Sequence, residues 1–112
     1  MTDLKDKKCV PCEGGVAPLT KEAAEKLLSQ LNGWQLSADA KQINKEYKFK
    51  NFYETMAFVN ATAWIANQEN HHPDLKVSYN RCDVAFSTHA IKGLSENDFI
   101  CGAKINFLLG TK

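Results

Sequence analysis

No apolar run in this 112-residue chain approaches the roughly 18 residues that a transmembrane helix needs. Residues 1–8 also lack the apolar stretch of a secretory signal peptide. Neither sign of charge is in excess, since 14 Lys and Arg residues face 13 Asp and Glu residues and leave a net charge of +1. Proteins that grip nucleic-acid phosphates usually carry a clear basic excess. We therefore expect a cytoplasmic protein without membrane contacts or direct nucleic-acid contacts.

The chain also has few residues of the kinds that mark special architectures, with 3 prolines, 6 glycines, no internal repeats and no low-complexity tract. Hydrophobic residues make up 44% and charged residues 24%, which is ordinary globular composition and excludes disorder for most of the chain. A chain of this length forms one core. We expect residues 1–18 to be a polar, partly mobile leader and residues 19–112 to be a single domain.

The four cysteines do not form a disulfide framework. Cys9 and Cys12 make a lone C-x-x-C in the leader, whereas Cys82 and Cys101 lie in apolar-periodic segments. In a reducing compartment, buried cysteines of this kind behave as small hydrophobic residues. Zinc at the C-x-x-C would need a second ligand pair, and a redox pair would be expected in a βαβ context. Both remain alternatives that the sequence does not favour.

Three segments combine the apolar spacing of amphipathic helices with a recognisable start. Each start has a side chain that can accept a hydrogen bond from the first turn, and two of them have an acidic residue three positions later. Helices are thus expected over residues 20–31, 51–69 and from Ser95 to shortly before Gly110, with caps at Thr20, Asn51 and Ser95 and acidic partners at Glu54 and Asp98. The apolar stripe of the second helix is formed by Phe52, Met56, Val59, Ala63 and Ala66.

Apolar residues that alternate with polar ones predict two β-hairpins. The first joins a short strand from Trp34 to a strand over residues 42–50, and the second turns at Asn80-Arg81. The element order is therefore α-β-β-α-β-β-α, which indicates an α+β fold with a four-stranded antiparallel sheet and three helices on one face. Such a sheet has two open edges, so self-association is expected.

The three histidines of the chain are His71, His72 and His89. Adjacent residues in extended backbone point to opposite sides, but the second hairpin can bring His89 back toward the other two. Imidazole both donates and accepts protons near neutral pH, and one positioned group contributes about 10²–10⁴-fold to a rate. The cluster therefore favours general acid–base chemistry. The alternatives are ordinary loop histidines and a three-histidine metal site, which lacks a supporting flanking pattern.

Several short segments around these histidines carry a family resemblance. They are Gly33-Trp34, residues 47–52, residues 70–74, Tyr79-Asn80, residues 87–89 and residues 93–99. In this order, over roughly residues 20–108, they resemble the pterin-4a-carbinolamine dehydratase family. Each piece is short, but their joint order is specific.

The resemblance implies a hydro-lyase that dehydrates 4a-hydroxytetrahydropterin to quinonoid dihydropterin and water without a metal or another cofactor. It implies a place in tetrahydropterin recycling for aromatic amino acid hydroxylation. By position, His71 and His89 would act as acids, and His72 would bind substrate or act as base. Substrate-binding residues by the same comparison are Asn70, Ser87, Thr88 and Asp98. Asp98 also has a purely structural explanation as the capping acid of the third helix.

One position departs from the family pattern, because many members have a carboxylate four residues before the first histidine and this chain has Asn67. Glu69 lies two residues before His71, and one alternative is that it replaces this carboxylate from a different angle. We expect it instead to be an exposed helix-end residue. The family forms homodimers, and homotetramers through the long helix, which would place Tyr53 and Trp64 against a partner. Trp34 is expected in the core. A non-enzymatic alternative is a dimerisation module for a transcription factor, a role of animal relatives.

Overall fold

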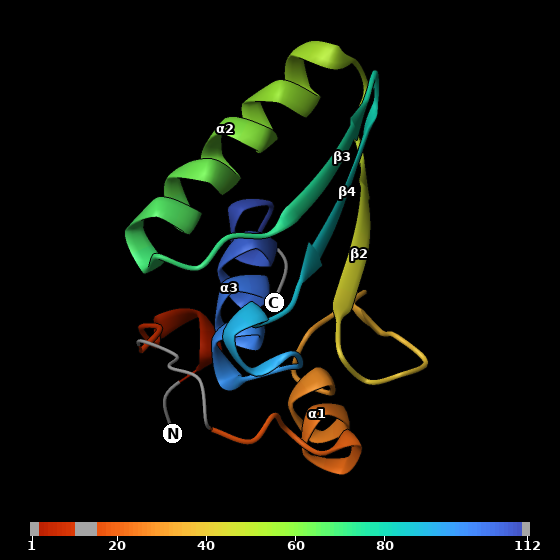
Figure 1. Cartoon of the computed structure of the whole chain (residues 1–112). Helices are drawn as coiled ribbons and strands as arrows, with labels where there is room; N and C mark the ends of the chain where they lie inside the picture. Colours follow the sequence, from red (N-terminus) through yellow and green to blue (C-terminus); the bar gives the residue numbers. More distant parts are fainter. Residues whose placement is uncertain (1–2, 11–15, 111–112) are drawn as a thin grey trace.

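The computed structural model describes residues 3–10 and 16–110. It contains a 3-10 turn η1 (Leu4–Asp6), α1 (Lys21–Leu28), β1 (Gln35–Leu36), β2 (Ile43–Lys48), α2 (Phe52–Glu69), β3 (Asp74–Ser78), β4 (Arg81–Phe86), a second 3-10 turn η2 (His89–Ile91) and α3 (Glu96–Leu108). The strands form one antiparallel sheet in the order β1-β2-β4-β3. Figure 1 shows β2, β4 and β3 side by side. The predicted α+β fold and element order are confirmed.

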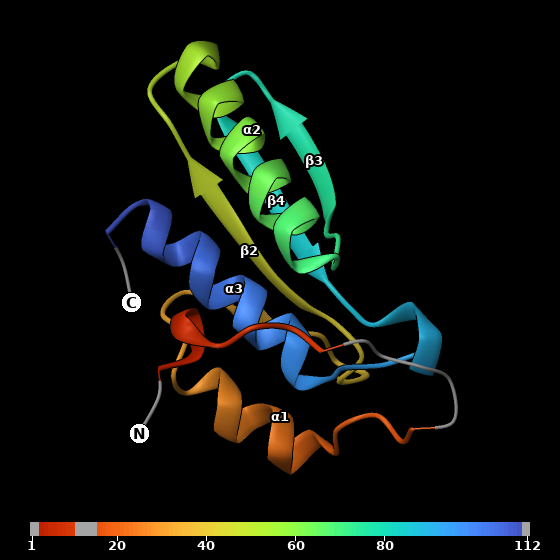
Figure 2. The same ribbon diagram turned by 90° about the vertical axis from the view of Figure 1, so that its left-hand side faces the viewer.

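The helices α2 and α3 lie over one face of this sheet, and α1 packs against α3 and β1 (Figure 2). The core between these layers is apolar, and its largest fully buried side chains include Ile43, Phe86, Leu94, Phe99 and Ile105. Trp34 is buried there as predicted, and its indole Nε1–H donates to Asn106 Oδ1 at 3.1 Å. In the described parts of the chain, no helix has the length and apolar character needed to span a membrane.

The predicted helix starts are found at the expected residues. Thr20 Oγ1 accepts from the Ala23 N–H at 3.2 Å, and Asn51 Oδ1 accepts from the Glu54 N–H at 2.9 Å. At α3, the Asp98 carboxylate accepts from the N–H of Ser95 at 3.0 Å. These contacts are local, so the sequence suffices to predict them. The first helix ends at Leu28, earlier than expected, because the next residues close tighter i to i−3 turns.

The buried face of α2 differs from the predicted apolar stripe. Of that stripe only Ala66 is buried, whereas Phe52 remains 49% exposed. The helix instead turns Thr55, Phe58 and Thr62 inward. Thr55 Oγ1 lies 2.9 Å from the carbonyl oxygens of both Asn51 and Tyr79. The prediction was wrong because it counted only apolar side chains, while these threonines bury a methyl group and, at Thr55, a satisfied hydroxyl.

The central strands β2 and β4 bury alternate side chains, as predicted. The edge strand β3 does not follow the prediction, because none of its residues is fully buried and Val77 is 40% exposed. On β4, Cys82, Val84 and Phe86 are buried, and on β2 so are Ile43 and Tyr47. Both Cys82 and Cys101 are fully buried free thiols, which confirms that they act as core residues. Among the described strands, β3 lies at an edge of the sheet and pairs with β4.

The described part of the leader is packed against the domain. Leu4 is buried in the core, and Lys104 Nζ donates to the carbonyl oxygen of Lys5 at 2.8 Å. This places η1 along α3 (Figure 2). The division of the chain at residue 18 stays a prediction, and Cys12 lies outside the described residues.

Candidate functional site

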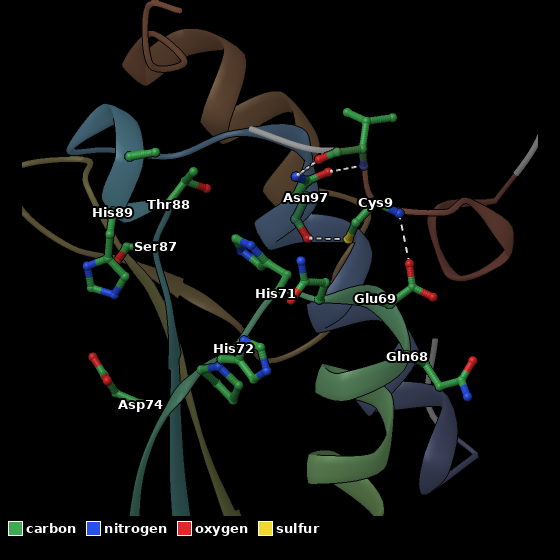
Figure 3. A pocket seen from close by; sticks show the side chains of 14 residues that line it. Cys9, Gln68, Glu69, His71, His72, Asp74, Ser87, Thr88, His89 and Asn97 are labelled. Atoms are coloured by element: carbon green, nitrogen blue, oxygen red, sulfur yellow. Dashed lines mark hydrogen bonds between the residues drawn. The ribbon is translucent and has the colours of Figure 1, made fainter. Parts of the chain in front are cut away.

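A pocket of about 670 Å³ lies where the end of α2, the start of β3 and the segment after β4 meet (Figure 3). Six residues that the sequence singled out line it, namely Asn70, His71, His72, Ser87, Thr88 and His89. The seventh, Asp98, contacts one of these histidines from α3. The structure therefore brings all seven predicted site residues together, and the role of each residue stays a prediction.

His71 is placed by the end of α2. Asn70 caps this helix in the left-handed conformation, with φ of 51°, and the His71 N–H donates to the carbonyl oxygen of Ala66 at 3.1 Å. The imidazole then stacks on Phe86, with ring centroids 5.8 Å apart and planes within 8° of parallel. These contacts leave the side chain only 12% exposed. His71 is thus a fixed ring at the pocket wall.

The main polar partner of His71 is Asp98, whose Oδ1 lies 2.6 Å from Nε2. The Asp98 side chain is fully buried, and its Oδ2 accepts from the Thr88 hydroxyl at 2.8 Å and from the Ser95 N–H. An ionised carboxylate can only accept hydrogen bonds, so Nε2 carries the hydrogen of this contact. The nitrogen Nδ1 is then the one that can take up a proton. Asp98 therefore orients the ring and selects its tautomer.

The contact between His71 and Asp98 was missed at the level of sequence. Asp98 was expected either to cap α3 or to belong to the site, and the structure gives it contacts of both kinds. A signal for this was present, because a capping box uses only one carboxylate oxygen and leaves the second free. That oxygen makes the bond to His71.

The other two histidines are more exposed. His72 Nε2 lies 3.3 Å from Asn67 Oδ1. Asn67, which stands where many family members have a carboxylate, therefore contacts the second histidine rather than the first. His89 was expected at the end of a strand, but β4 already stops at Phe86 and His89 begins η2. Both imidazoles border the pocket and are open to solvent.

Thr88 is buried, and its polar groups are already engaged inside the protein. Its N–H donates to the Gly93 carbonyl at 2.8 Å, and its hydroxyl contacts both Asp98 and Ser95 at 2.8 Å. These bonds tie the segment after β4 to the start of α3. Thr88 therefore helps to fix the Asp98 carboxylate, and a direct role in substrate binding stays a prediction.

Glu69 is not the exposed helix-end residue that the sequence suggested. Its side chain is 13% exposed, its Oε1 accepts from the Cys9 N–H at 2.8 Å, and its Oε2 lies 3.8 Å from Lys104 Nζ. The leader also supplies Cys9 and Val10 to the pocket wall. The sequence could not predict this part of the pocket wall, because no local pattern relates residue 9 to residue 69.

No metal site is evident within residues 3–10 and 16–110, where no three His, Cys, Asp or Glu side chains come together suitably for an ion. Cys12 is outside these ranges, so the C-x-x-C alternative stays untested. The site as described is a set of imidazoles and one buried carboxylate, which is suited to moving protons.

Comparison with known proteins gives a consistent result. The family described as pterin 4 alpha carbinolamine dehydratase matches residues 17–108. A protein of Nitrosomonas eutropha, provisionally named pterin-4-alpha-carbinolamine dehydratase, is 62% identical over 108 residues, which cover 96% of this chain and 94% of that protein.

Two solved structures share the fold. One, described as a transcriptional coactivator/pterin dehydratase from Brucella melitensis, has a TM-score of 0.79 and 33% identity, and the match covers 83% of this chain and 99% of that one. The other is a pterin dehydratase-like protein described as a RuBisCO assembly factor in the alpha-carboxysome. Its TM-score is 0.63 at 17% identity, over 72% of this chain and 94% of that one, so it shows the fold alone.

Proposed function

Because this chain belongs to the pterin 4 alpha carbinolamine dehydratase family, we propose that it is a hydro-lyase that dehydrates 4a-hydroxytetrahydropterin to quinonoid dihydropterin and water. The observation that carries the proposal is the gathering of His71, His72 and His89 around one pocket, with His71 bonded to the buried Asp98. The pocket volume of about 670 Å³ lies in the range of small-molecule sites and suits a fused bicyclic ring.

The reaction requires two proton transfers. The bond between the ring carbon and the hydroxyl oxygen breaks as an acid protonates the leaving oxygen. A base takes the proton from the neighbouring ring nitrogen, and the electron pair of that N–H bond forms the new C=N bond. The pterin is neither oxidised nor reduced by an outside group. The reaction therefore requires an acid, a base and a fixed substrate orientation from the protein.

We assign the acid role to His71 and His89 and the substrate-binding or base role to His72, following the family resemblance. His71 suits transfer through Nδ1, since Asp98 occupies Nε2. His72 and His89 are open to solvent, which lets them exchange protons with water between turnovers. Asn70 and Ser87 border the pocket and would supply polar contacts to the edge of the pterin, with Asp98 and Thr88 supporting His71 from behind.

The same proposal places the protein in tetrahydropterin recycling for aromatic amino acid hydroxylation, in the cytoplasm. It also includes self-association as a homodimer or homotetramer. Support for the latter comes from α2, where Tyr53 and Trp64 are 84% and 65% exposed. They border two apolar grooves that the end of α3 completes with Phe107, Leu108 and Leu109.

The alternative is a protein-binding module without activity, which the coactivator name of the Brucella relative brings into consideration. The two functions make different demands on the histidines. A binding module tolerates their loss, whereas the dehydratase does not. Because both functions can coexist on one fold, the histidine variants test the enzyme and a partner-binding assay tests the module.

The direct test is a stopped-flow dehydration assay with enzymatically generated 4a-hydroxytetrahydropterin. The wild-type protein is expected to accelerate the formation of quinonoid dihydropterin. His71→Ala and His89→Ala should each lower turnover by about 10–10⁴-fold, a range that includes the ~10²–10⁴-fold contribution of one positioned acid or base. An inactive, folded wild-type protein would refute the proposal, and loss of activity after chelation would refute the metal-free mechanism.

A further inference from the structure

A second pair of reactive side chains lies beside the histidine cluster. Cys9 Sγ is 3.5 Å from Cys101 Sγ, although the two residues are 92 positions apart. Cys9 belongs to the leader and is half-buried at the pocket, whereas Cys101 is fully buried in α3. The proposed dehydration uses neither thiol.

The backbone around Cys9 holds this approach from both sides. The Cys9 N–H donates to Glu69 Oε1 at 2.8 Å (Figure 3). The next residue, Val10, exchanges two hydrogen bonds with the Asn97 side chain, at 3.1 and 2.7 Å. The Cys9 thiol also donates to the Asn97 carbonyl oxygen at 3.7 Å. The proximity of the sulfurs therefore depends on the anchored chain and not on one side-chain rotamer.

We propose that Cys9 and Cys101 form a peroxide-oxidisable pair whose disulfide fastens the leader onto α3 at the edge of the pocket. A disulfide requires the two sulfurs to approach by a further ~1.5 Å, to about 2.05 Å. A small shift of the Cys9 side chain and of the leader backbone beside it would close this distance.

The oxidation proceeds in two balanced steps. Hydrogen peroxide oxidises the Cys9 thiol to a sulfenic acid, and one water molecule leaves. The Cys101 sulfur then attacks the Cys9 sulfur, the S–O bond breaks, and the hydroxyl departs as a second water molecule with the Cys101 proton. Two thiols and one peroxide thus give one disulfide and two water molecules. A thiol reductant reverses the change.

The surroundings of the two thiols indicate which reacts first. The hydrogen bond with Cys9 and burial both raise the pKa of Cys101, which disfavours its thiolate. Cys9 lines the pocket and can meet a small oxidant there. Cys101 then acts as the resolving thiol. It is buried, but its sulfur lies 3.5 Å from that of Cys9 and can therefore attack it.

The disulfide would close a loop that includes most of the chain. A cross-link of this kind removes much of the freedom of the unfolded chain. Oxidation should therefore raise the melting temperature by roughly 5–20 °C, and reduction should return it to the starting value.

The test treats the full-length wild-type protein with hydrogen peroxide, blocks remaining thiols and digests it with trypsin. Cleavage after Lys8, Lys21, Lys92 and Lys104 places Cys9 in peptide 9–21 and Cys101 in peptide 93–104. We expect these peptides to be joined, with a combined mass lower by two hydrogen atoms. Cys82, in peptide 82–92, serves as an internal control and should stay unlinked.

Peptide 9–21 also contains Cys12, so two matched variants assign the bond. Cys12→Ser should keep the link to peptide 93–104 and the rise in melting temperature. Cys9→Ser should lose both. A bond within peptide 9–21, or no bond at all in folded wild-type protein, would overturn the proposal.

Discussion

At the residue scale, the site depends on one carboxylate that serves two purposes. Asp98 Oδ2 caps α3 and accepts from Thr88, while Oδ1 holds His71 at 2.6 Å. Since the side chain is fully buried, the ring and the helix start are fixed by the same group. Substitutions that remove one of these contacts and keep the other can therefore show whether Asp98 stabilises the fold, assists the reaction, or does both.

The substitution Asp98→Asn keeps the shape of the side chain but gives it an amide that can donate to His71. We expect turnover to fall by about 10–100-fold, because the preferred tautomer of the ring is lost. The control is Ser95→Ala, which removes a neighbouring hydroxyl without touching His71 and should cost about 1 kcal/mol of unfolding free energy with little loss of rate. Steady-state kinetics and urea unfolding check both. Equal rates for Asp98→Asn and wild type would show that Asp98 only caps the helix.

A second prediction at this scale concerns His72, whose ring borders the pocket and contacts Asn67. If this imidazole binds substrate, His72→Ala should raise KM by about 10-fold, the loss expected for one hydrogen bond of moderate strength. Asn67→Ala, which removes only the neighbour, should change KM less. Initial rates over a range of substrate concentrations test this. An unchanged KM with a large fall in kcat would instead assign His72 to the proton transfer itself.

At the element scale, a buried tyrosine on β2 contributes to the pH dependence of stability. Tyr47 donates its hydroxyl hydrogen to Asn106 Oδ1 at 2.6 Å, and burial raises its pKa above the usual value. The unfolded chain would then lose this proton first as pH rises above about 10. The folded state binds the proton more tightly in that window, so unfolding free energy should fall as pH rises through it.

The matched variants are Tyr47→Phe, which removes the titrating group, and Tyr79→Phe, which changes an exposed tyrosine. Unfolding free energies from urea denaturation at pH about 8 and about 11 provide the measurement. Wild type and Tyr79→Phe should lose more stability between these values than Tyr47→Phe does. Parallel losses in all three proteins would contradict the role given to Tyr47.

The elements also show which features the sequence could predict. Caps at Thr20, Asn51 and Ser95 depend on residues within one turn, so their patterns were sufficient. The face of α2 was not predictable from apolar spacing, since its orientation depends on threonines and on contacts with β3 and β4. Contacts within one helical turn can be predicted from the sequence, whereas the rotation of a helix about its axis depends on the elements that it packs against.

The candidate site likewise has one part that the sequence could predict and another that it could not. The histidines were identifiable because they are few and because their neighbours follow a family pattern. The bond from His71 to Asp98 spans 27 positions, and that from Cys9 to Glu69 spans 60. Such pairs come together only once the hairpin and the leader are placed, so no spacing rule could have found them.

At the scale of the whole molecule, an exposed apolar surface runs along α2 and the end of α3. Tyr53 and Trp64 are exposed there, beside grooves of about 490 and 360 Å³. Large exposed apolar patches typically mark contact surfaces. This is the surface through which we expect copies of the chain to associate.

Sedimentation velocity at micromolar concentration should therefore show a species larger than the monomer. Trp64→Ala should shift the distribution toward smaller species, because it removes the largest exposed ring of this surface. Lys26→Ala on α1, away from the patch, should leave the distribution unchanged. A wild-type protein that sediments only as a monomer would contradict the expected association.

The central claim is that the histidines around the pocket dehydrate a pterin carbinolamine. Its most direct test is the single-turnover rate of the His71→Ala/His89→Ala double variant, measured by stopped flow with enzymatically generated substrate and with circular dichroism as the control for folding. The account predicts that the folded double variant loses nearly all of the enzymatic acceleration. A double variant that keeps the wild-type rate would contradict it.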